Sequence, residues 1–100
     1  MPLWMVKHFI DSAIEHADAA SSKVDNWAQE NASKLGNDVA DDLESKAESL
    51  KGDADDLATE VDEGASLTEL LETAGDLAAA TAELLTEAAA AAAAAGIVFA

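Results

Sequence analysis

The chain has 100 residues; half of them are apolar, and 25 of these 50 are alanine. It carries 21 acidic residues against five lysines, a formal net charge of −16 at pH 7, and it contains neither cysteine nor arginine. The composition excludes disulfides and cysteine nucleophiles. We also expect no nucleic-acid partner, because affinity for phosphates comes mainly from Lys and Arg.

The first predicted element is an amphipathic helix over residues 3–34, within an N-terminal segment 1–35. Apolar residues recur there at a strict 3-4 spacing, the heptad stripe by which one helix packs against another. The stripe consists of Leu3, Val6, Ile10, Ala13, Ala17, Ala20, Val24 and Trp27. Large apolar side chains surround the start of this helix on nearly every side, so we expect this end to contact a partner subunit or a lipid surface. The candidate interaction residues are Leu3, Trp4, Val6, Phe9 and Ile10.

The middle segment 36–64 is predicted to form an acidic, solvated helix over residues 38–63. It holds 11 acids against two lysines, while apolar residues recur every three or four positions. Gly36, followed by Asn37 and a second polar residue, indicates the end of one helix and the start of the next. Whether the chain turns or only kinks there is left open. Two turns would give an antiparallel bundle, whereas kinks would give a rod of about 130–140 Å at 1.5 Å per residue.

The last segment, 65–100, is predicted to be an Ala/Leu-rich helix over residues 66–95 with an apolar C-terminus. Ser66 and Glu69 form the pattern of a capping box just after Gly64. The expected packing seam consists of Leu67, Leu70, Ala74, Leu77, Leu84, Ala88 and Ala91. The 13 uncharged residues at the C-terminus are too few to cross a bilayer, and a lipid-exposed span would resist the glutamates before them. We therefore expect this helix to pack against other helices.

No constellation of side chains points to catalysis. His8, Asp11 and Glu15 share one helical face, but a solvated acidic face has the same pattern, so no metal site is predicted. The serines lie in no nucleophile elbow or Gly-rich phosphate loop. The paired carboxylates lack a pocket that would separate their pKa values. We therefore expect no catalytic residue, metal, cofactor or small-molecule substrate, and the chain is predicted not to be an enzyme.

The excess of acids, the scarcity of lysine and the abundance of alanine and aspartate resemble the proteins of extreme halophiles. At low salt the carboxylates repel one another and destabilise a compact state, whereas at molar salt the Debye length falls to about 3 Å. No signal peptide is predicted, because the positive residues of the N-terminus follow the apolar ones. We expect a high-salt cytoplasm or a virion as the location, with membrane association as an alternative. An acidic disordered segment would have a similar charge, but the apolar periodicity argues against it.

The fold is thus predicted to be all-α, with two or three long amphipathic helices in an extended rod, an antiparallel bundle or a coiled coil, and no β-sheet. The first functional hypothesis is a self-associating structural component of a larger assembly, such as a haloarchaeal virion. The second is a peripheral protein of a membrane or lipid granule that binds through the N-terminal segment. The third is a tape-measure-like protein of a viral tail. In composition and periodicity alone, the chain resembles the helical segments of tail tape-measure proteins, so no residue roles transfer.

Overall fold

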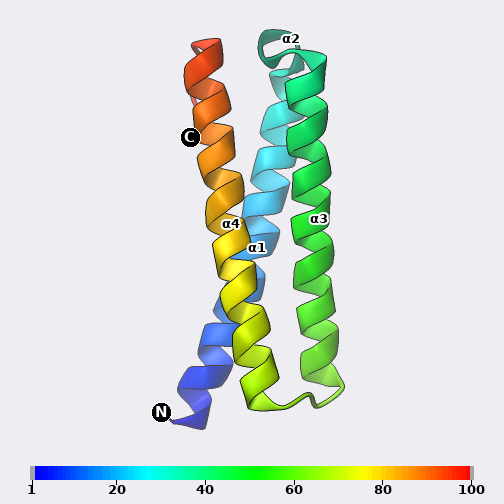
Figure 1. Ribbon diagram of the computed structural model, residues 1–100, viewed down its shortest axis with the longest axis vertical. Helices are drawn as coiled ribbons and strands as arrows, with labels where there is room; N and C mark the ends of the chain where they lie inside the picture. Colours follow the sequence, from blue (N-terminus) through cyan, green and yellow to red (C-terminus); the bar gives the residue numbers. More distant parts are fainter. Residues whose placement is uncertain (1, 100) are drawn as a thin grey trace.

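The computed structural model describes residues 2–99 and folds them into an antiparallel bundle of three long helices (Figure 1). The elements are α1 (Leu3–Glu30), α2 (Ala32–Leu35), α3 (Asn37–Asp62) and α4 (Leu67–Ala95). The bundle measures 46 × 21 × 15 Å. The prediction of an all-α bundle is confirmed, and the alternative of an extended rod is wrong. Because α1 and α4 run in the same direction, the start of α1 lies at the same end as the α3–α4 turn (Figure 1).

The core is formed by the apolar stripes, whose 3-4 spacing keeps them on one side of each helix. α1 contributes mainly alanine and valine, while α3 and α4 contribute leucines that alternate with alanine. Small residues on α1 permit the close approach of the two leucine-bearing helices, which gives the bundle its narrow cross-section. The α4 seam is buried at Leu70, Ala74, Leu77, Leu84 and Ala88, partly buried at Ala91 and exposed at Leu67. It packs against α1 and α3 of the same chain.

The first helix ends earlier than predicted, at Glu30, because Asn31 leaves the helical conformation at φ −112° and ψ 17°. The side-chain Nδ2 of Asn31 donates a hydrogen bond to the carbonyl oxygen of Trp27 at 2.9 Å, and its backbone N–H donates to the same oxygen at 3.0 Å. Asparagine side chains compete in this way with the regular backbone ladder. The four-residue α2 then leads to Gly36, whose φ of +92° and ψ of 145° turn the chain into α3.

The α3–α4 connection follows the predicted pattern. Gly64 has a φ of +78°, and the backbone N–H of Ala65 donates to the carbonyl oxygen of Glu60 at 3.1 Å. This hydrogen bond from residue i+5 to residue i satisfies a carbonyl group at the end of α3. Ser66 begins the next helix: its Oγ accepts a hydrogen bond from the backbone N–H of Glu69 at 3.3 Å. The predicted N-cap is therefore confirmed.

Among the described residues, α4 is the one helix that by length and composition could cross a membrane. Only 28% of its most apolar 18-residue window is buried in the bundle. The outward face of α4 carries small residues at 3-4 spacing, all of them exposed: Gly75, Ala79, Ala82, Thr86, Ala89 and Ala93. α4 thus packs against α1 and α3 along one face and leaves an uncharged face open.

Candidate functional site

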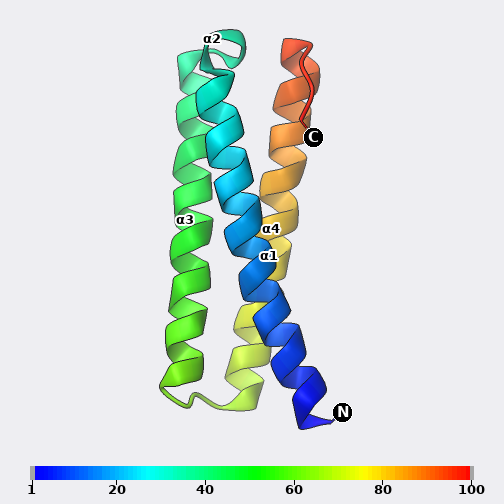
Figure 2. The ribbon, with the colours of Figure 1, turned by 180° about the vertical axis from the view of Figure 1, so that it is seen from behind.

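The start of α1 forms an exposed apolar surface, here called the N-terminal tip, consisting of Leu3, Trp4, Met5 and Phe9. Their side chains are 60%, 69%, 44% and 44% exposed, respectively. The first acidic residue of the chain is Asp11, so the stretch of α1 that carries the tip contains no carboxylate. The tip lies at one extremity of the bundle (Figure 2). A cluster of exposed large apolar side chains on a strongly charged protein is typical of an interaction site.

The predicted interaction residues fall into two groups in the structure. Leu3, Trp4 and Phe9 are exposed, whereas Val6 and Ile10 are 5% and 2% exposed and belong to the core. Val6 and Ile10 therefore hold the first turns of α1 against the bundle and are not available to a partner. The sequence reasoning omitted Met5, although its position inside the same apolar run was a sufficient signal.

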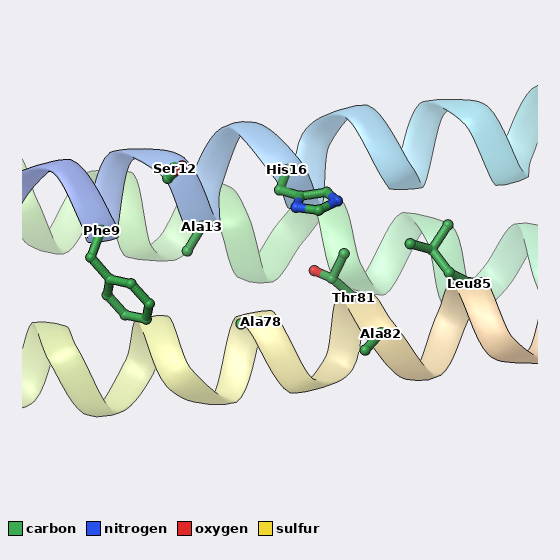
Figure 3. Close-up of a pocket in the computed structure, with 8 residues that line it drawn as sticks. All are labelled: Phe9, Ser12, Ala13, His16, Ala78, Thr81, Ala82 and Leu85. Atoms are coloured by element: carbon green, nitrogen blue, oxygen red, sulfur yellow. The ribbon is translucent and has the colours of Figure 1, made fainter.

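A groove of about 360 Å³ lies between α1 and α4, directly beside the tip (Figure 3). It is lined by Phe9, Ser12, Ala13 and His16 of α1 and by Ala78, Thr81, Ala82 and Leu85 of α4. Ala13 and Ala78 face each other across the groove, and His16 lies across from Thr81 (Figure 3). Phe9 stands at one end of the groove and Leu85 at the other. The space exists because serine and alanine cannot fill the gap between the two helices.

The lining of this groove contains no carboxylate. Four other cavities between the helices each include at least two acidic side chains. Three of them follow the α3–α4 interface, where Asp53 and Glu87 each line two cavities. The α1–α4 groove and the tip share Phe9 and so form one surface. None of the residues that define this surface is acidic, although the protein has a net charge of −16.

The opposite end of α1 is covered by the chain's own C-terminal tail, residues 97–99. Gly96 ends α4 in the left-handed conformation at φ 72°, and the tail turns back along the bundle (Figure 2). Trp27 Nε1 donates a hydrogen bond to the carbonyl oxygen of Val98 at 2.9 Å. The Phe99 ring packs edge-on against Trp27 with 5.0 Å between centroids, and the Lys23 ammonium lies 5.0 Å from the centre of the same ring. The Phe99 ring therefore packs within its own chain, whereas the Val98 side chain is 78% exposed.

One lysine of the acidic α3 helix forms an ion pair with α4. Lys46 Nζ lies 3.0 Å from a carboxylate oxygen of Asp42 and 3.0 Å from one of Glu87. Hydrogen bonds to Glu87 and then to Asp42 raise the pKa of Lys46. The Glu87 pair joins the two helices across a surface that is otherwise lined largely by carboxylates and alanine. Because both pairs are exposed to solvent, salt screens their attraction.

The carboxyl group of Glu44 lies where α3 faces α1. Partial burial, followed by repulsion from Asp25 of α1 and Asp41 of α3, raises the pKa of Glu44 above its ordinary value of 4.5. A raised carboxyl pKa means that the ionised form disfavours the fold. The stability that this group contributes is present below its ordinary pKa and is lost as pH rises through the raised value.

We therefore expect Glu44→Gln to raise the urea midpoint at about pH 7 and to change it little at about pH 4. The gain should shrink in molar KCl, because salt screens the repulsion. A double-mutant cycle with Asp25→Asn measures how much of the gain comes from the α1–α3 pair. A lower urea midpoint for Glu44→Gln at neutral pH and low salt would contradict this electrostatic explanation.

The structure contains no candidate metal centre in residues 2–99: no group of three or more His, Asp or Glu side chains could hold an ion there.

Comparison of the chain with protein-family models, with curated proteins and with solved structures finds no match.

Proposed function

We propose that this chain is a non-enzymatic structural module that joins a larger assembly through its N-terminal tip. The observation that carries the proposal is the exposure of Leu3, Trp4, Met5 and Phe9 together at one end of the bundle. Elsewhere the stripes place their leucines in a shared core, apart from Leu67, which is 44% exposed at the start of α4. Burying such apolar side chains against a partner gives each about 1.5–3 kcal/mol relative to full exposure.

The distribution of charge supports the same function. Acidic residues cover the outer surfaces of α3 and keep the bundle hydrated. The residues that form the tip and the open face of α4, in contrast, are uncharged. Small exposed residues such as Ala79 and Ala82 permit the close approach of another helix. A setting of high salt, as in a haloarchaeal cytoplasm or virion, would screen the repulsion between neighbouring modules.

A peripheral lipid-binding function is the second candidate, and the residues around Trp4 favour it. An exposed indole ring near Lys7 and His8 suits the headgroup region of a membrane, where aromatic rings and long cationic side chains settle. A tape-measure function draws no support from a bundle 46 Å long, because that hypothesis requires an extended chain.

Light scattering of the full chain in about 2 M KCl, a concentration that leaves a Debye length of only a few ångströms, tests the assembly function. We expect a mass of two or more chains for the natural sequence and a shift toward the monomer for the double variant Leu3→Ser with Trp4→Ser. Val39→Ser, a matched removal of an exposed apolar residue far from the tip, should leave the mass unchanged.

Flotation with phosphatidylcholine vesicles separates the two candidates. A natural chain that stays monomeric and floats, and loses flotation in the same double variant, would overturn the assembly function in favour of lipid binding. A chain that neither associates nor floats would contradict both.

A further inference from the structure

The exposed side of α1 that borders the groove carries a second heptad stripe, distinct from the core stripe. Its members recur at a 4-3-4-3-4 spacing and are all exposed: Met5, Phe9, Ser12, His16, Ala19 and Lys23. None of them is acidic, although α1 contains five acids on its other faces. The two charged or titratable members, His16 and Lys23, are bases. This stripe and the α1–α4 groove form one surface.

From this surface we infer that two copies of the chain pair through the α1–α4 groove, with each Phe9 ring entering the groove of the other copy. The inference rests on the proposed assembly function and names a second copy as the partner of Met5 and Phe9, the two tip residues that belong to the stripe. Two chains of net charge −16 repel each other wherever their carboxylates meet. The groove and stripe give them a contact surface from which acids are missing on both sides.

The spacing of the stripe fits a twofold axis. In an antiparallel pair whose twofold axis lies between Phe9 and Ser12, the order Met5, Phe9, Ser12, His16 matches its own reverse. In this register Phe9 lies opposite Ser12 of the second copy and Met5 lies opposite His16. Twofold contacts are self-complementary in this way: residue i meets j, and j meets i. The bulky ring therefore meets the small residues that leave the groove open.

Phe9 contributes to such a contact both as the inserted ring and as a wall of the groove. Its ring is 44% exposed, so a partner can bury it, and it also forms one wall of the cavity of about 360 Å³. In the pair, the Phe9 rings of the two copies would lie side by side, each between the partner's Phe9 and His16. Aromatic side chains at the centre of a desolvated patch provide most of the energy of many interfaces.

Sedimentation equilibrium in about 2 M KCl, where charge repulsion is screened, tests the pairing with two variants that act oppositely on the groove. Phe9→Ser removes the ring, and Ala78→Leu fills the groove of an intact bundle. We expect each to weaken dimerisation by about tenfold or more, equivalent to 1.4 kcal/mol. Ala94→Leu makes the same change at an exposed position of α4 outside both the groove lining and the open small-residue face, and should leave dimerisation unchanged. Far-ultraviolet circular dichroism checks that each variant remains helical.

Cross-linking tests the antiparallel geometry, because the natural chain has no cysteine. In the twofold pair, residue 12 lies about 4.5 Å along the axis from its own copy, at 1.5 Å per residue. Ser12→Cys should form a covalent dimer on mild oxidation, whereas Ser22→Cys, exposed on another face of α1, should not.

Dimers that persist in both Phe9→Ser and Ala78→Leu but vanish in the Leu3→Ser, Trp4→Ser double variant would overturn the groove pairing and leave the assembly function standing. Equal cross-linking at positions 12 and 22 would also overturn it. A chain that is monomeric at all concentrations in molar salt would contradict both the pairing and the assembly function.

Discussion

Replacing Leu57 with alanine is expected to lower the free energy of unfolding by about 2–5 kcal/mol, the range for a buried leucine that leaves a cavity. Leu57 is fully buried where α3 meets the other two helices and is among the largest side chains with no exposed surface. The free energy of unfolding of a small domain is only about 5–15 kcal/mol, so this one change would remove much of the stability of the bundle.

Urea unfolding followed by circular dichroism measures the loss from Leu57→Ala, in molar KCl so that the starting protein is well folded. Leu67→Ala is the matched control, because Leu67 belongs to the same kind of stripe but is exposed at the start of α4. We expect a change within about 0.5 kcal/mol for the control. Equal losses from the two substitutions would mean that Leu57 does not occupy the shared core.

Gly36→Ala is expected to cost about 1–3 kcal/mol. The backbone of Gly36 has φ +92° and ψ 145°, a region that side-chain-bearing residues occupy only with strain. No atom of a neighbouring residue lies within 4 Å of an added Cβ, so the cost would come from the backbone conformation and not from a clash.

Gly52→Ala, the same chemical change, is expected to have the opposite effect on the free energy of unfolding. Gly52 lies inside α3 with helical backbone and open space around it, and alanine there should raise stability by about 1 kcal/mol. Urea midpoints of the two variants should therefore move in opposite directions. A stabilising Gly36→Ala would indicate that the chain continues through this position as a helix.

The core could be predicted from the sequence because a 3-4 apolar spacing assigns each position to a face before any contact is known. The same rule separates the N-terminal residues: Val6 and Ile10 lie on the core stripe, while Trp4 and Phe9 do not. The prediction that grouped all of them as interaction residues used hydrophobicity alone. Phase within the helix, not apolar character, separates these four, whereas Leu3 lies on the core stripe and is still 60% exposed at the start of α1.

Other features depend on contacts that the local sequence does not encode. The turn at Gly36 could not be distinguished from a kink, because glycine permits both and tertiary packing selects one. Asn31 ends α1 through a side-chain hydrogen bond that an asparagine inside a helix need not form. The return of the tail depends on Trp27 meeting Val98 and Phe99, which are more than 70 positions away in the chain.

The two indole rings of the molecule stand at its opposite ends in contrasting surroundings. Trp4 is largely in solvent, whereas Trp27 is partly covered and bonded to the returning tail. Each ring can thus report on its own end by fluorescence, since a single Trp→Phe exchange silences one of the two signals. Coverage of the first helix turn should shift the emission of Trp4 to shorter wavelength, and detachment of the last residues should shift that of Trp27 to longer wavelength.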